Sequence, residues 1–159
     1  MKQRVLSAVV WALIGMALMG AIVWFAMPSM MLIKRPSQHS YGETIALLNQ
    51  SLASKGDWRV LAVNDYQKAT ATFGAIERTG SMSVCNPRYA SRILADDADR
   101  GVTAFMPLAI GVYEDKHGRV YVTRLNVGML GMIFGGTISD VMAMAGTDLN
   151  EVVTSVAPD

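Results

Sequence analysis

The stretch LAIGVYEDKHGRVYVTRL, residues 108–125, decides the fold class of this chain. Its two halves, Leu108–Glu114 and Arg119–Leu125, are rich in Val, Ile, Tyr and Thr, which favour β-strands. Between them, Lys116-His117-Gly118 has the length and the glycine of a hairpin turn. The stretch therefore predicts a β-hairpin, and with it a sheet whose neighbouring strands run antiparallel.

Helical and strand patterns precede this hairpin. Tyr41–Lys55 is predicted to be a helix that ends at Gly56, and Trp58–Val63 is predicted to be a strand. Residues 65–75 fit either a short helix or a loop, and Ser81–Cys85 is expected to form a further strand. The apolar positions of the helix recur at spacings of three and four residues: Ile45, Leu48 and Leu52.

A strong helix start follows the strand. Asparagine is a favoured N-cap and proline suits the first helical position, so Asn86-Pro87 predicts a helix through Arg88–Leu94. Three aspartates and a glycine after this helix indicate a solvated loop at residues 96–101. They lack the spacing of a calcium-binding loop.

The chain after the hairpin is apolar. We expect Val127–Ala145 to be helical in its second half, and Thr147 or Asp148 to cap a last helix, Leu149–Val156. The order of helix, strands, hairpin and helices predicts an α+β domain at residues 41–159, in which helices pack on a small antiparallel sheet.

The N-terminal region has a different character. Val5–Phe25 contains 21 residues without a charged side chain, and a helix of that length rises about 31 Å, enough to cross a hydrocarbon core. We predict a transmembrane anchor at residues 5–27, a cytoplasmic start at residues 1–4 and a linker at residues 28–40. The alternative is a removed signal peptide, but the apolar run is long for one and no Ala-x-Ala cleavage site follows it.

Small and aromatic residues of the anchor suggest its contacts. Trp24 suits the membrane interface, and the Ala17/Ala21 pair allows a partner helix to approach closely. A helix that faces only lipid is the alternative. Two basic residues flank the span on each side, and the short leading segment favours an N-inside orientation in a bacterial inner membrane, with the domain in the periplasm. The residues assigned to the anchor are Trp11, Gly15, Ala17, Ala21 and Trp24.

Composition excludes several function classes. Four of the 14 basic residues precede residue 36, so ten basic residues face 13 acidic ones in the remainder. That balance, without a basic stripe, argues against nucleic-acid binding. Cys85 is the only cysteine, which excludes an intramolecular disulfide and a cysteine-rich metal site.

Two segments carry a family resemblance. SMSVCNPRYASRIL at Ser81–Leu94 and MPLAIGVYEDKHGRVYV at Met106–Val122 resemble the bacterial and archaeal domain of unknown function number 302. The resemblance covers about residues 41–153, and Leu108 stands where some members carry a second cysteine. It implies a compact α+β module that occurs in bacterial envelopes and sometimes beside redox proteins, and it implies no settled activity.

The turn Cys85-Asn86-Pro87-Arg88 is the first candidate site. Helix N-termini stabilise thiolates and bind anions, so Cys85, Asn86 and Arg88 could hold a ligand or metal, with copper or haem as the first to try. The structural alternative is a small strand residue beside a helix cap. No cofactor is predicted outright, and no catalytic set is evident. His39 and His117 lack metal-ligand spacing, although a thiol nucleophile is a third alternative.

The uncharged segment Val127–Ile138 is the second candidate site. It is too short to span a bilayer, so it is either a core helix or an apolar surface for a membrane or partner. The residues predicted to contact a partner are Val127, Met129, Leu130, Gly131, Met132, Phe134 and Gly135.

From these features we expect a non-catalytic, membrane-anchored accessory subunit of an inner-membrane complex. A respiratory electron-transfer complex is suggested because members of the resembling family sometimes occur beside redox proteins. Its expected partners are membrane lipids and integral-membrane subunits. The alternative is an envelope protein that binds a small ligand or metal at the Cys85 turn.

Overall fold

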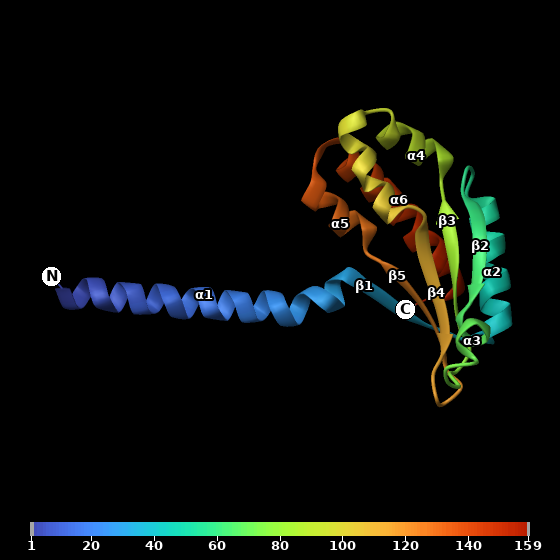
Figure 1. Cartoon of the computed structure of the whole chain (residues 1–159), viewed down its shortest axis with the longest axis horizontal. Coiled ribbons are helices and arrows are strands. Elements are labelled where there is room, and N and C mark those ends of the chain that lie inside the picture. The colour runs from blue at the N-terminus through green and yellow to red at the C-terminus, as the bar shows by residue number, and fades with distance from the viewer. Residues whose placement is uncertain (1, 159) are drawn as a thin grey trace.

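An antiparallel sheet of five strands in the order β1-β5-β4-β3-β2 organises the domain (Figure 1). The computed structural model describes residues 2–158, with side-chain burial from residue 11 onward. Every neighbouring pair of strands is antiparallel. The strands are β1 (Leu32–Ser37), β2 (Arg59–Asp65), β3 (Thr79–Cys85), β4 (Leu108–Glu114) and β5 (Val120–Leu125).

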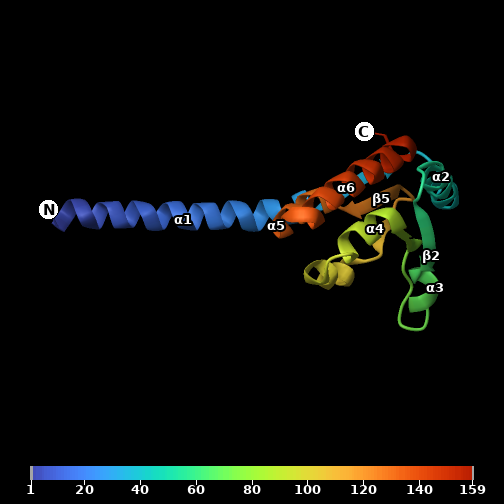
Figure 2. The same cartoon turned by 90° about the horizontal axis from the view of Figure 1, so that it is seen from above.

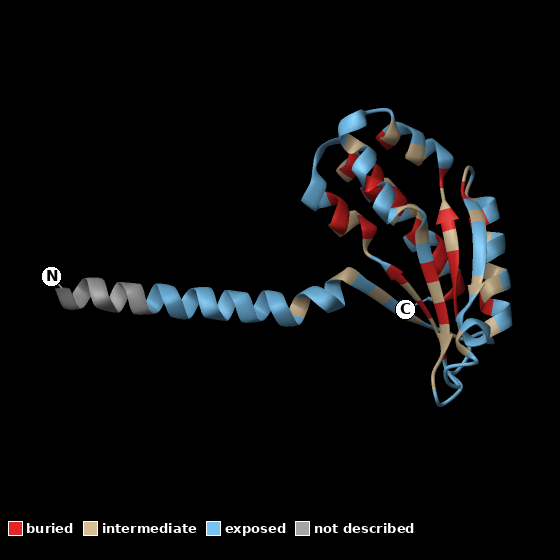
Figure 3. Ribbon diagram, viewed as in Figure 1, coloured by how far each residue is buried: buried red, intermediate tan, exposed pale blue. Residues whose placement is uncertain are grey.

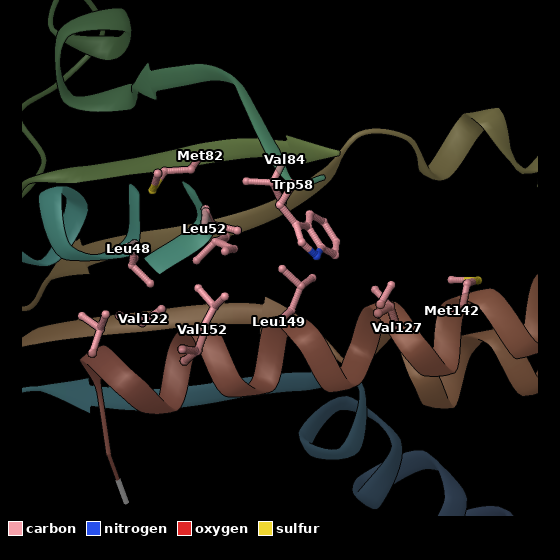
Figure 4. Packing of buried hydrophobic residues seen from close by; sticks show 14 of the residues in the cluster. Leu48, Leu52, Trp58, Met82, Val84, Val122, Val127, Met142, Leu149 and Val152 are labelled. Atoms are coloured by element: carbon pink, nitrogen blue, oxygen red, sulfur yellow. The ribbon is translucent and has the colours of Figure 1, made fainter. Parts of the chain in front are cut away.

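Helices cover one face of this sheet. Figure 2 shows the two long ones, α2 and α6, on the same side of the strands. Leu48 and Leu52 of α2 meet Leu149 and Val152 of α6 over the sheet (Figure 4), and all four are fully or almost fully buried. The predicted α+β class is therefore confirmed. The helices after the first are α2 (Tyr41–Ser54), α3 (Tyr66–Thr70), α4 (Pro87–Leu94), the 3-10 helix η1 (Asp97–Phe105), α5 (Val127–Phe134) and α6 (Gly136–Val156).

The predicted hairpin is the middle of the sheet. β4 has the predicted bounds, and Glu114 faces Val120 across the turn. Asp115 closes that turn by accepting hydrogen bonds from the backbone N–H groups of His117 and Arg119. Gly118 has a φ of 76°, a conformation that favours glycine.

The prediction of a linker at residues 28–40 is wrong. Helix α1 (Lys2–Met31) continues through Pro28, and residues 32–37 form the edge strand β1, paired with β5. Lys34, Arg35 and Pro36 resemble loop residues by composition. An edge strand accepts them because proline lacks only an N–H that no neighbour needs and because charged residues commonly line sheet edges.

Two expectations about helices are also corrected. The region of residues 96–101 is the start of η1, in which the Asp96 side chain caps the first turn. The last helix does not begin at Thr147 or Asp148, because α6 runs unbroken from Gly136. Its buried stripe, which includes Ala145, Leu149 and Val152, packs on the sheet, and this burial outweighs the local cap signals.

Helix α1 projects from the domain as a single arm (Figures 1 and 3). Its 30 residues span about 45 Å. Within it, Trp11–Met31 is long and apolar enough to cross a membrane, and none of the tested window is buried inside the structure.

Candidate functional site

The Cys85 turn forms where β3 runs into α4. The Asn86 side chain accepts hydrogen bonds from the backbone N–H groups of Arg88 (3.1 Å) and Tyr89 (3.3 Å), and Pro87 takes the first helical position. The predicted N-cap is therefore confirmed. Asn86 is buried, and its side-chain oxygen is occupied in holding the turn.

An apolar cavity of about 50 Å³ lies beside the turn. Cys85 and Leu108 both line it, because Leu108 pairs with Val84 on the neighbouring strand. Polar groups gather next to its aromatic lining: Trp58 Nε1 and Tyr89 Oη both donate to Asp148 Oδ2, at 3.0 and 2.9 Å. Such a volume is well below that of a drug-sized ligand site.

Electrostatics do not favour a reactive thiol at Cys85. Burial raises the pKa of the thiol above its ordinary value, so the neutral form prevails at neutral pH. The Arg88 guanidinium pairs with Asp57 at 2.8 Å (Nε to Oδ2) and its side chain is largely exposed. Although it precedes a helix N-terminus, Cys85 is therefore a protonated, partly buried side chain.

No group of three or more His, Cys, Asp or Glu side chains that could hold a metal occurs among the residues that the structure describes. His39 lies between β1 and α2, and His117 lies in the hairpin turn. The methionines of the C-terminal region differ in burial: Met142 is buried in the core, whereas Met132 is exposed.

The second candidate segment is two-sided. Val127, Leu130 and Gly131 of α5 are buried, and a Cβ on Gly131 would lie 2.7 Å from Cβ of Met142. Three neighbouring side chains point outward, with exposed fractions of 68 % for Met132, 71 % for Ile133 and 45 % for Phe134. Sequence analysis left the segment as either a core helix or an apolar surface, and the structure divides it between the two.

The end of α1 is joined to the start of α5. Asn126 caps α5 by accepting from the Met129 N–H at 3.3 Å. It also donates its backbone N–H to the Met31 carbonyl (2.8 Å) and its side-chain amide to the Met30 carbonyl (3.2 Å). Sequence analysis missed Asn126 as the residue that joins the two helices, although an asparagine before an apolar run is a recognisable cap signal.

Sequence analysis did not single out Phe105, and it included Ile133 in the candidate segment without naming it as a contact residue. Phe105, at the end of η1, meets Phe134 edge to face with ring centroids 5.6 Å apart. An open apolar hollow of about 220 Å³ lies beside Phe105, lined by residues of η1, β4, β5, α5 and α6. No local sequence pattern could bring Phe105 to Phe134, because η1 and α5 are separated by the hairpin.

The residues assigned to the anchor all lie on α1, within Trp11–Met31. Trp11 and Trp24 are exposed, and a Cβ added to Gly15 would meet nothing within 4 Å. The small-residue face with Ala17 and Ala21 is likewise exposed along the arm.

Comparison with known proteins supports the fold. The family model described as "Domain of unknown function DUF302" matches residues 33–156. A solved structure, that of an uncharacterized conserved protein DUF302 from Bacillus stearothermophilus, is similar with a TM-score of 0.71 and 22% sequence identity, over 80% of this chain and 99% of that one. No curated protein matches.

Proposed function

This chain belongs to the DUF302 family, and on that premise we propose that it is a membrane-anchored, non-catalytic accessory subunit of an inner-membrane complex. The main support is helix α1. It is apolar, none of its tested membrane-spanning window is buried, and Asn126 joins its end to the folded domain. An exposed apolar surface of that size in water is costly, so lipid or protein must cover it.

The properties of the Cys85 turn argue against a catalytic role for its thiol. A protonated, partly buried thiol is a poor nucleophile, and Asn86 and Arg88 already have partners within the domain.

The expected partners are lipids around α1 and an integral-membrane subunit against its small-residue face, Ala17 and Ala21. We place the domain in the periplasm, and a respiratory electron-transfer complex is the assembly to test first.

The test is mild detergent extraction from native membranes, native-gel separation and mass spectrometry of what co-migrates. We expect co-migration with a larger complex at fixed ratio, and its loss in Ala17→Ile/Ala21→Ile, which fills the small-residue face. Met19→Leu/Val23→Leu is the matched control and should stay in the complex. Free migration of the unaltered chain away from every larger complex would sink the proposal.

A second candidate function is ligand binding at the Cys85 turn, where Cys85 lines an apolar cavity of about 50 Å³ that admits only a small ligand. Copper(I) is the probe that fits this volume, haem is a second probe that would bind only outside the cavity, and spectroscopic titration of the full chain is the measurement. Cys85→Ser with unchanged folding and an abolished ligand signal would support it. An unchanged signal in that variant would exclude the turn.

A further inference from the structure

We propose that the exposed end of α5 inserts into the surface of the same membrane that α1 enters, so that the domain is held at two points. The inserted group, here called the α5 tip, consists of Met132, Ile133, Phe134 and Phe105. These side chains lie at the boundary between the lipid headgroups and the acyl chains. The inference rests on the proposed anchoring by α1.

The chemistry of the α5 tip suits that boundary. All four side chains are exposed, and Phe105 and Phe134 are in direct contact. Between Arg124 and Asp140 the chain has no charged residue, so insertion would bury no charge from this segment. Apolar side chains on a short amphipathic element insert about 5–10 Å into such an interface.

The position of the α5 tip is set by the joint with α1. Asn126 holds the first turn of α5 against the carbonyls of Met30 and Met31, the last residues of the candidate span. The eight residues of α5 extend about 12 Å from there. In Figures 1 and 2 the α5–α6 turn lies at the edge of the domain from which α1 departs. If α1 spans the membrane, this edge faces it.

The size of the α5 tip favours lipid over a protein partner. A stable protein interface buries about 800 Å² on each side, far more than a few side chains on one turn supply. A weak lipid contact is sufficient here, because α1 already keeps the tip at high local concentration beside the bilayer.

The test uses the full chain with Cys85→Ser, reconstituted in phosphatidylcholine/phosphatidylglycerol bilayers and spin-labelled at one introduced cysteine. Ile133→Cys reports on the α5 tip, Ile14→Cys on α1, and Val63→Cys on another exposed apolar residue, on β2. Oxygen partitions into lipid and a nickel chelate stays in water. We expect the ratio of oxygen to nickel accessibility at position 133 to be several-fold above that at position 63, and below that at position 14.

Each contrary result has its own meaning. A water-like ratio at position 133 with a lipid-like ratio at position 14 would overturn the inference and leave the anchor intact. Poor access of both reagents at position 133 would overturn it in favour of a protein cover. A water-like ratio at position 14 would overturn the anchor itself, and the inference with it. Met132→Cys provides a second labelling site on the same turn.

Discussion

The two ends of β5 offer a direct comparison. Before the strand, the turn between β4 and β5 carries Asp115, Lys116 and Arg119; after it, residues 125–139 carry no charge. The turn is largely exposed and the second segment is exposed on one side, and in each a side chain accepts backbone hydrogen bonds, Asp115 in one and Asn126 in the other.

What surrounds the two segments differs. Asp115 pairs with Arg119 within its own turn, at 2.8 Å from Nε to Oδ2. The charged groups of that turn therefore have partners within the turn and in water. Asn126 reaches instead to the carbonyls of the apolar arm, and the side chains that follow it are hydrophobic. Exposure alone therefore does not tell whether water, lipid or protein covers a surface, because the residues around that surface decide it.

The largest effect is expected at Gly131, where the uncharged segment packs on α6. In Gly131→Ala the new Cβ would lie 2.7 Å from Met142 Cβ and 3.3 Å from Ser139 Cα. We expect a loss of about 2 kcal/mol in the free energy of unfolding, measured by urea denaturation of the full chain in detergent. Gly42→Ala, with nothing within 4 Å, is the control and should be neutral or slightly stabilising. Equal effects would show that the α5–α6 contact is not close packed.

Removal of the Asn126 side chain should have the next largest effect. Asn126→Ala loses the cap of α5 and the bond to Met30, and we expect a loss of about 1–2 kcal/mol in unfolding experiments. It should also loosen the joint, seen as faster amide exchange at residues 127–130. Asp65→Ala, which removes the cap of the short helix α3, should leave that exchange unchanged. Unaltered exchange in Asn126→Ala would break the proposed link between α1 and α5.

Each end of the sheet also has an aromatic pair. Phe105 and Phe134 meet edge to face at the apolar end, whereas Tyr113 and Tyr121 stack at 5.3 Å near the charged turn, with Lys34 Nζ 4.0 Å from the Tyr121 ring centroid. A double-mutant cycle with alanine should give a coupling of about 1 kcal/mol for the Phe pair. Only the coupling of the Tyr pair should depend on Lys34, tested with Lys34→Met. Dependence of both couplings on Lys34 would contradict the separation of the two ends.

The smallest effect is the pH response of the charged turn. Loss of hydration opposes ionisation of Asp115, but hydrogen bonds from the Arg119 side chain and from the Arg119 and His117 N–H groups lower its pKa from 3.8 to about 2. Since unfolding restores the higher pKa, the stabilisation is complete above about pH 5 and is lost as the pH falls towards 2. Asp115→Asn should flatten this part of the stability profile in acid denaturation. An unchanged profile would show that other carboxyl groups govern it.

Local sequence determined much of the fold. The bounds of β4, the start of α2 at Tyr41 and the Asn86-Pro87 helix start follow from propensity, capping and turn chemistry between near neighbours. These signals are local, so they survive whatever the rest of the chain does. The apolar arm was equally visible, since its length and lack of charge need no tertiary context.

Tertiary structure alone decided the rest. It turned the expected linker into edge strand β1, because β5 supplies the backbone partners that a single strand cannot supply for itself. It divided α5 into buried and exposed faces and brought Phe105 to Phe134 across the hairpin. It also partly buried the Cys85 thiol beside a helix start that would otherwise favour its ionised form. Burial and long-range pairing depend on residues far apart in the chain, which is why no local pattern contains them.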